Sequence, residues 1–418
     1  MKCSRAADEE GFQAELFKFG ASVLGPYLSI LFNRVIHTGF PVSWSRHLIH
    51  PIHKTGPVSD PGNYRTIMIG NTFDKLYATA LNNMLSVELD RIGCRARGQA
   101  GFQTDYQTMD HIFTLRAIIE EARHRSEKVY CCFVDFRKAF DSVPRVALFE
   151  RLREIGISEM LRIAIMRLYE TVVGRFRTPD GFSDPIHSTI GVKQGCPLSP
   201  TLFGLYIDEL EDFLLKSSLP GDGCYLYQVL ISILLFADDI VLLASSPDGL
   251  QRLLDRLALF CDQRQLVVNL GKTRVMVFNC LKTSHLHFIF QGQEIEIASS
   301  YLYLGVLFSG PRFSMRPAIQ PRVNKGMGSL AFLEKQCFKH HFQDTPSKLS
   351  LLDALVRPTV LYDSVVWGPS LLSSDWASIE RVQTLFLRRI IRCHRSTPHS
   401  IILAEFGVIL SDSQPSLT

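Results

Sequence analysis

The chain has 418 residues, of which 46% are hydrophobic and 21% are charged, and its formal net charge at pH 7 is +4. This length exceeds one compact core and the composition excludes an intrinsically disordered protein, so we expect two or three folded subdomains. The first ten residues are polar and contain no basic and then apolar leader, which predicts an intracellular protein without a secretory signal.

The first third of the chain has the spacing of helices around two extended segments. It predicts a helix over residues 10–37, an extended segment over 44–54 paired with a turn and strand over 60–67, and two further helices over 71–90 and 108–125. The strands place Lys54 and Arg65 near their ends, where two cations can converge on a phosphate; ordinary surface charges are the alternative. A glycine-punctuated loop at 98–103 precedes the last of these helices.

The middle of the chain alternates strands and helices irregularly, which suggests an α+β sheet with helices on one face. We expect a strand at 129–136, helices at 138–156 and 202–214, and a hairpin at 234–243. A helix at 247–264, a strand at 275–278 and strand pairs at 285–297 and 301–306 follow. Asp135 stands at the end of the first strand, and Gly195 permits close backbone approach in the loop before the helix at 202–214. No G-x-x-x-x-G-K-S/T segment is present, which excludes a P-loop nucleotidase.

The C-terminal third is helical and basic. Helices are expected over residues 321–338, 346–364 and 373–393, the second of them around Pro358. Residues 311–395 contain 13 Lys and Arg against 6 Asp and Glu, whereas residues 1–310 contain 32 against 33. A solvated surface accounts for a modest excess, but a basic segment joined to a near-neutral body indicates an arm that holds a polyanion through its phosphates.

The ten cysteines do not form a zinc-binding pattern. None of them lies in a C-x-x-C or Cys/His spacing of a zinc site, and Cys393-His394 has no second pair. We therefore expect reduced thiols and no zinc site.

Two adjacent carboxylates, Asp238 and Asp239, interrupt an otherwise apolar run over residues 234–243. Burying an unpaired charge costs several kcal/mol, and a central Asp costs roughly 2.5 to 3.5 kcal/mol in a membrane, so the segment is no membrane span. The pattern predicts a hairpin whose turn carries both aspartates out of the sheet. An ordinary Asp-containing turn is the simple alternative to a site for a hard divalent cation.

Adjacent strands would bring Asp135 beside Asp238, at roughly the 5 Å that separates paired strands. Three carboxylates in that position can hold two Mg²⁺ ions about 3.5 to 4 Å apart, a geometry that stabilises the attacking and leaving oxygens in phosphoryl transfer.

Six short segments of the sequence occur in the same order as the motifs of a known family. They are NYR at 63–65, QAGF at 99–102, FVDFRKAFD at 133–141, GVKQGCPLSP at 191–200, FADD at 236–239 and YLG at 303–305. Together they resemble the core motifs of reverse transcriptases from non-LTR, LINE-type retrotransposons. The resemblance covers residues 10–310, with a looser match beyond.

The resemblance implies a right-hand polymerase that copies RNA into DNA, using an RNA template, a DNA primer and deoxynucleoside triphosphates. Its fingers would span residues 1–128, its palm, with an antiparallel sheet and packed helices, residues 129–310, and its helical basic thumb residues 311–418. No membrane partner is implied, and the expected compartment is the nucleus or cytoplasm if the chain belongs to a eukaryotic retroelement.

The resemblance also implies roles for particular residues. Asp135 and Asp238 would bind two Mg²⁺ ions, or Mn²⁺, with Asp239 completing the acidic cluster and the Phe136 carbonyl assisting. Phe140 would exclude a ribose 2′-hydroxyl. The other residues would contact nucleotide, template or primer. Lys54 and Arg65 would bind the triphosphate, and Lys272 would approach it as a proton donor. Gln194 and Gly195 would lie along the nucleotide and template, and Tyr303, Leu304 and Gly305 would hold the primer end.

Departures from the family pattern suggest a second hypothesis, a decayed remnant that only binds RNA. AADEEGF at 6–12 stands where the family usually has Pro-Gly-x-Asp-Gly, so the fingers look truncated, and Thr66 replaces a proline that commonly follows the arginine. No endonuclease precedes the polymerase motifs and no zinc knuckle follows them, so we expect that this chain alone does not insert DNA. RNA-directed RNA synthesis is disfavoured by Phe140.

Overall fold

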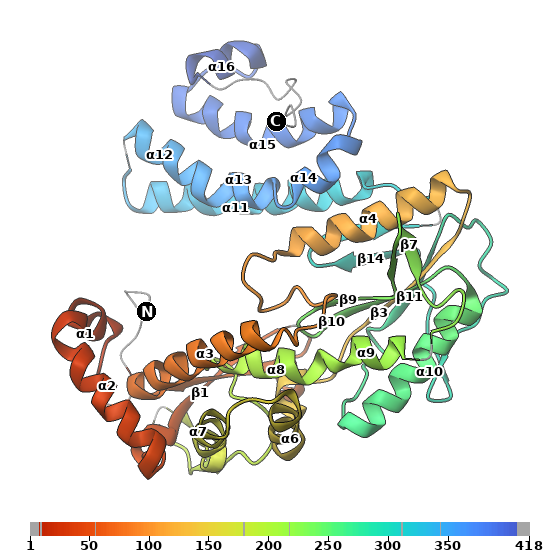
Figure 1. Ribbon diagram of the computed structural model, residues 1–418. Coiled ribbons are helices and arrows are strands. Elements are labelled where there is room, and N and C mark those ends of the chain that lie inside the picture. The colour runs from red at the N-terminus through yellow and green to blue at the C-terminus, as the bar shows by residue number, and fades with distance from the viewer. Residues whose placement is uncertain are drawn as a thin grey trace.

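The computed structural model describes residue 8 and residues 11–54, 56–178, 180–216, 218–310, 312–342 and 344–407. Two larger sheets, three two-stranded hairpins and several layers of helices make up these residues (Figure 1). Of the residues behind the sequence predictions, those at 1–7, 9–10 and 408–418 lie outside the described part. No helix in the described part is both long enough and apolar enough to cross a membrane.

The central sheet has the strand order β11-β3-β10-β9, and all of its pairings are antiparallel. The strands are β3 (Val129–Val134), β9 (Ile233–Phe236), β10 (Asp239–Ala244) and β11 (Arg274–Phe278). All six residues of β3 are buried, so this strand has an apolar contact on both faces of the sheet. A central strand of this kind needs cover on both faces.

Helices cover both faces of the central sheet, so the expectation of helices on one face is wrong (Figure 1). Cys132 and Val134 face a core shared with α10 (Pro247–Arg264) and α8 (Ser199–Ile207), whereas Cys131 and Phe133 face a core shared with α4 (Thr108–His124) and the C-terminal helices. The uninterrupted apolar sequence of β3 is the physical reason, because neither of its faces offers polar side chains to water.

A second sheet has the order β2-β1-β4-β5, with β6 also paired to β4. Its strands are β1 (Arg46–His53), β2 (Tyr64–Gly70), β4 (Val173–Thr178), β5 (Gly181–Phe182) and β6 (Ile186–His187). The predicted pairing of the first two strands is confirmed, since Ile52 lies opposite Arg65. The parallel pairing of β1 with β4 joins segments from before and after β3.

Three of the helices predicted before residue 311 are divided in the structure. The helix expected over 10–37 is α1 (Ala14–Phe19) and α2 (Ala21–Thr38), which meet at Gly20. The helix expected over 138–156 is α5 (Ala139–Ser142) and α6 (Arg145–Ile155), because Pro144 disfavours helical backbone at Val143. The helix expected over 202–214 is α8 followed by α9 (Glu209–Leu215), and Asp208 between them keeps helical dihedral angles.

Further helices and hairpins complete the part that contains the sequence motifs. The helices are α3 (Thr72–Ile92) and α7 (Glu159–Glu170), and the short strands are β7 (Cys224–Leu226), β8 (Val229–Ile231), β12 (Ile289–Phe290), β13 (Gln293–Glu294), β14 (Ser300–Tyr303) and β15 (Val306–Ser309). The left-handed Gly93 ends α3, as the sequence predicted.

The C-terminal helices stack beyond α4 in Figure 1. They are α11 (Ile319–Lys339), α12 (Thr345–Leu351), α13 (Arg357–Val360), α14 (Ser364–Trp367), α15 (Ser373–Ile391) and α16 (His399–Glu405). The single helix expected over 346–364 is interrupted. Since Pro358 has no N–H to donate to the preceding turn, the chain widens there into a π-turn at Leu352–Val356.

Candidate active site

The turn between β9 and β10, the aspartate turn, contains Ala237 and Asp238, whereas Asp239 is the first residue of β10. The predicted hairpin is confirmed, but only Asp238 lies outside the strands. Asp239 pairs with Phe236 across the hairpin, and Ala237 has a positive φ of 58°. Gln99 holds this turn, because its side-chain Oε1 accepts hydrogen bonds from the backbone N–H of Ala237 at 3.0 Å and of Gly101 at 2.8 Å. The loop at 98–103 is therefore the support of the aspartate turn.

Asp135 follows β3 directly and lies beside the aspartate turn. Val134 pairs with Ile240, so the chain positions after Val134 and before Ile240 are neighbours on adjacent strands. The Asp135 side chain accepts a hydrogen bond from Asn269 Nδ2 at 2.9 Å, and Lys272 Nζ lies 3.9 Å from the same Oδ2. These contacts fix the carboxylate and place Lys272 beside Asp135.

The carboxylates repel one another in this site. Burial and then the charge of Asp135 raise the pKa of Asp238. The Asp239 side chain reaches solvent, yet the surrounding protein removes much of its hydration, and this effect, followed by repulsion from Asp238 and Asp135, raises the pKa of Asp239 to about 6. The three aspartates therefore lie near enough for their charges to influence one another.

Lys54 and Arg65 face these carboxylates from the second sheet. Lys54 follows β1, and its backbone N–H donates to the Asn63 carbonyl at 2.9 Å. Loss of hydration and the neighbouring cations Arg65 and Lys272 lower the pKa of the Lys54 ammonium, whereas Asp238 and Asp135 raise it. The two cations predicted to bind phosphate thus lie within electrostatic reach of the aspartates.

The donor set suits a hard divalent cation, since carboxylate oxygens are the ligands that Mg²⁺ prefers. Within the described ranges, however, no three His, Cys, Asp or Glu side chains are already close enough together to hold a metal ion. The nine cysteines of those ranges are all free thiols. The mutual repulsion of the aspartates is the observation that fits cation binding at this position.

Phe140 lies between two other aromatic rings near the site. Its ring stacks on the buried Phe203 ring, with centroids 4.6 Å apart and planes 15° apart, and the Phe102 ring meets it edge-on at 6.0 Å. Phe136 itself is 5% exposed, and its backbone bridges to Val268.

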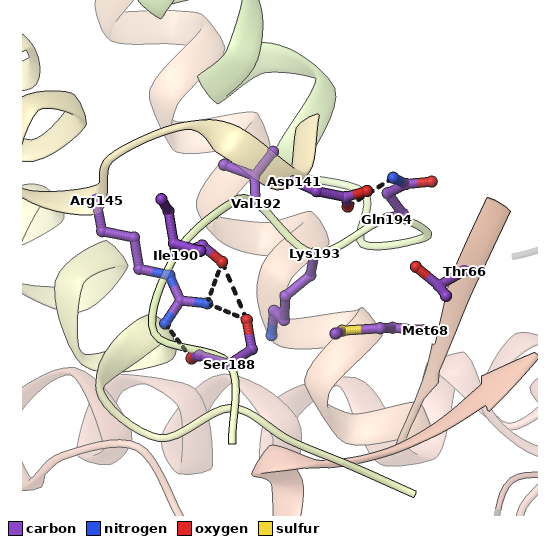
Figure 2. A pocket seen from close by; sticks show the side chains of 9 residues that line it. All are labelled: Thr66, Met68, Asp141, Arg145, Ser188, Ile190, Val192, Lys193 and Gln194. Carbon is purple, nitrogen blue, oxygen red and sulfur yellow. Dashed lines mark hydrogen bonds between the residues drawn. The ribbon is translucent and has the colours of Figure 1, made fainter. Parts of the chain in front are cut away.

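Gln194 and Gly195 lie against β2. The Gln194 carbonyl accepts from Met68 N–H at 2.8 Å, and Gly195, with a φ of +106°, approaches so closely that a Cβ there would lie 2.7 Å from the Met68 carbonyl oxygen. Gln194 Nε2 donates to Asp141 Oδ1 at 2.7 Å beside a cavity of about 230 Å³ (Figure 2). The motif thus places Gln194 between β2 and α5.

The residues at 303–305 form the turn of the β14–β15 hairpin. The Tyr303 side chain is 2% exposed, and its hydroxyl lies 3.4 Å from His111 Nδ1. The Leu304 carbonyl accepts from the Tyr362 hydroxyl at 3.2 Å, and the Gly305 carbonyl accepts from the Arg322 guanidinium. Only the backbone and the Leu304 side chain of this turn are available to a ligand, because the Tyr303 ring is buried.

The side chains that position the predicted site residues had no role assigned from the sequence. Gln99 was part of a recognised motif, and its position before Gly101 was the available signal for a structural role. Asn269 offered no local signal, because its partner Asp135 lies 134 positions earlier. Asp141, the last residue of the motif at 133–141, had no assigned role, but it is partly buried and accepts a hydrogen bond from Gln194.

Residues 52–308 match the family described as reverse transcriptase (RNA-dependent DNA polymerase). The match covers more than half of the chain, which therefore belongs to the reverse transcriptase family and has its right-hand polymerase fold.

The sequence relatives are proteins of retrotransposable elements. The chain is 25% identical over 381 residues to the probable RNA-directed DNA polymerase from transposon BS of Drosophila melanogaster, covering 88% of this chain and 40% of that protein. It is also 25% identical over 389 residues to the Pol polyprotein of the R2 element of Popillia japonica, covering 90% of this chain and 52% of that protein. The resemblance to non-LTR retrotransposon enzymes is thereby confirmed. The chain spans about half, or less, of these relatives.

Among solved structures, the chain is similar to a telomerase from Candida albicans in complex with a fragment of telomeric RNA. The TM-score is 0.49 at 12% sequence identity, with 94% of this chain and 68% of that chain covered.

Proposed function

We propose that this chain is an RNA-directed DNA polymerase that adds deoxynucleotides to a primer 3′-hydroxyl on an RNA template by two-metal nucleotidyl transfer. The observation that carries the proposal is the convergence of Asp135, Asp238 and Asp239 at one end of the central sheet, opposite Lys54 and Arg65. Opposed carboxylates and cations are what a reaction between a hydroxyl and a triphosphate requires.

In this proposal, Asp135, Asp238 and Asp239, with the Phe136 carbonyl, would hold two Mg²⁺ ions or, in their place, Mn²⁺. Bound metal ions would stabilise the attacking and leaving oxygens of the transfer. Asn269 holds the carboxylate of Asp135 for this role.

Other side chains of the site would bind and orient the nucleotide. Lys54 and Arg65 would neutralise the charge that develops on the leaving pyrophosphate. Phe140, fixed by the Phe203 ring, would occupy the space of a ribose 2′-hydroxyl. Lys272, near Asp135, would approach the triphosphate and is proposed as a proton donor.

Template and primer would be held on either side of these residues. Gln194 and Gly195 would lie along the nucleotide and the template, and Tyr303, Leu304 and Gly305 would hold the primer end through the turn. The fingers are assigned to residues 1–128, the palm to 129–310 and the thumb to 311–418. The basic thumb would follow the backbone of the hybrid duplex by charge rather than by sequence.

The test is extension of a DNA primer on an RNA template by the purified chain with Mg²⁺. We expect deoxynucleotide addition that requires the metal and is lost in Asp238→Ala. Absence of any metal-dependent extension by the wild type would contradict the proposal and favour an RNA-binding remnant. Equal use of ribonucleotides would contradict the role of Phe140, and Phe140→Ala should increase ribonucleotide use.

A further inference from the structure

The side-chain amide of Gln194 is held in one orientation by Asp141. Gln194 Nε2 donates to Asp141 Oδ1 at 2.7 Å, and in Figure 2 the amide oxygen points away from that carboxylate. An ionised carboxylate only accepts hydrogen bonds, so it binds the NH₂ end of the amide and leaves the oxygen end directed elsewhere. Without this partner, the amide could rotate and present either end.

The segment that carries Asp141 is also joined to the Gln194 loop through the backbone. Val192 N–H donates to the Phe140 carbonyl at 2.9 Å, and Gly191 N–H donates to the Val143 carbonyl at 2.9 Å. Gly191 has a φ of +81°, and a Cβ there would lie 2.7 Å from the Asp141 carbonyl oxygen. The two segments are therefore in direct contact, with no room for a side chain at Gly191.

Arg145 fastens the other end of the same loop. Its Nη1 donates to the Ser188 carbonyl at 2.7 Å (Figure 2). The same Nη1 also donates to the Tyr169 carbonyl at 3.1 Å, and Nε donates to the Gly191 carbonyl at 3.0 Å. A guanidinium that is bound to several carbonyls at once loses little freedom for each further bond. Asp141 therefore acts on a loop whose backbone is already fixed.

The charges around Asp141 allow a second explanation of its presence. Burial raises the pKa of Asp141, whereas the hydrogen bond from Gln194 and then the cations Lys138, Lys54 and Arg65 lower it. Asp141 could thus act only as a negative charge behind the cations that bind phosphate. An experiment has to separate the hydrogen bond from the charge.

We propose that Asp141 is a positioning residue that holds the Gln194 amide in the orientation that receives the incoming nucleotide. The inference rests on the proposed polymerase function and adds to it a residue that acts through Gln194. Asp141 itself does not touch the nucleotide.

The test is a double-mutant cycle on single-nucleotide addition, with Asp141→Ala, Gln194→Ala and the combined variant. We expect Asp141→Ala to raise the KM for the deoxynucleotide about tenfold, the change typical of a lost hydrogen bond to a charged group, with little change in kcat. In the Gln194→Ala background, Asp141→Ala should have no further effect. Multiplying effects in the combined variant would overturn the proposal.

Asp141→Asn separates the hydrogen bond from the charge, because its amide oxygen can still accept from Gln194. We expect a KM within about threefold of the wild-type value, whereas loss of a counter-charge alone would make Asn as harmful as Ala. An Asn variant that behaves like the Ala variant overturns the proposal. Asp90→Ala, at an exposed position of α3, is the matched control and should leave KM unchanged.

Nucleotide binding measured without catalysis distinguishes a change in nucleotide positioning from an indirect effect of the substitution on the reaction. With a dideoxy-terminated primer, nucleotide retention on the protein–RNA/DNA complex should weaken in Asp141→Ala by the same factor as KM, while the melting temperature of the free protein should stay close to that of Asp141→Asn. Unchanged nucleotide retention in Asp141→Ala would overturn the inference alone. A wild type that neither extends nor retains nucleotide would overturn the proposed function, and the inference with it.

Discussion

Two hairpin turns lie near α4, whose His111 contacts the Phe236 ring of one hairpin and the Tyr303 hydroxyl of the other, and they are held in different ways. The turn at Ala237, between β9 and β10, is bound by Gln99, which lies in the loop that precedes α4. The turn at Leu304, between β14 and β15, is bound by Tyr362 and, at its next residue, by Arg322. Both of these last residues belong to the C-terminal helical region. A displacement of that region therefore reaches the second turn directly but not the aspartate turn.

Tyr362 and Arg322 also contact each other at the second turn. Arg322 is 6% exposed, and its guanidinium carbon lies 4.5 Å from the centroid of the Tyr362 ring. The Tyr362 hydroxyl also lies 3.0 Å from Thr108 Oγ1. Tyr362 therefore connects α4, the second turn and the C-terminal helices. The aspartate turn has no equivalent contact to the C-terminal helices among the hydrogen bonds of the described residues.

The largest expected effect is at the aspartate turn. We expect Asp238→Asn to reduce primer extension at least 1,000-fold, an effect of the size typical for loss of a group that stabilises developing charge. The melting temperature should not fall, because the substitution removes repulsion from Asp135. Rates from single-turnover extension and a thermal melt measure both. Residual extension within tenfold of the wild type would contradict the role of this carboxylate.

Gly101 lies in the loop that supports the aspartate turn, so a substitution at Gly101 tests this support without changing an aspartate. In Gly101→Ala the new Cβ would lie 2.2 Å from the backbone nitrogen of Ala237, so one of the two backbones has to move. We expect a 10- to 100-fold loss of extension and a destabilisation of about 1 to 3 kcal/mol in the free energy of unfolding.

The matched control for this substitution is Gly328→Ala, in α11, where nothing lies within 4 Å of the added Cβ. It should leave extension unchanged and slightly increase stability, as Ala replaces Gly in a helix. Equal losses in both variants would show that the close approach at Gly101 is unimportant.

A smaller and different effect is expected at the second turn. Tyr362→Phe removes the hydroxyl that binds the Leu304 carbonyl and contacts Thr108. We expect primer–template affinity to fall about threefold to tenfold while the rate of one addition step on saturating duplex stays within about twofold. Binding titrations and single-turnover rates separate the two quantities. Tyr27→Phe, at a 70% exposed position, is the control.

The smallest effect concerns His111, which lies between the two hairpins. Its ring contacts the Phe236 ring and the Tyr303 hydroxyl, and burial lowers its pKa to about 4. In the unfolded chain the group titrates near 6.5, so below that pH only the unfolded chain takes up the proton, and stability falls with pH down to about 4.

Between pH 7 and pH 6 this proton uptake should cost about 0.7 kcal/mol of unfolding free energy. Urea denaturation of the wild type and of His111→Asn measures the contribution as the difference between their pH profiles. The exposed His124→Asn is the control and should keep the wild-type slope. Parallel profiles for wild type and His111→Asn would contradict a neutral buried imidazole.

Local patterns were sufficient to predict the parts of the site that carry charge. The aspartate hairpin and the strand before Asp135 depend on neighbouring residues, and β1 pairs with β2, the next strand along the chain. The partners that hold these groups were not predictable in the same way. Gln99 lies 138 positions before the Ala237 N–H that it binds, and no local pattern encodes such a distance.

Some errors were avoidable from the sequence. Pro144 was a visible signal for the break between α5 and α6, and the apolar run of β3, without a polar alternate position, was a signal that both sheet faces are covered. The burial of the Tyr303 ring was less accessible, since it depends on α4 and His111, which lies 192 positions earlier.

The parallel pairing of β1 with β4 has a consequence for how the chain is made. During synthesis, β1 and β2 leave the ribosome long before β4, and the whole of β3 is produced in between. Until β4 arrives, one edge of β1 has no partner, and unpaired strand edges invite association with other chains. A nascent chain stalled before residue 173 should therefore be more prone to aggregate than one stalled after residue 187, which links the order of translation to the solubility of the protein.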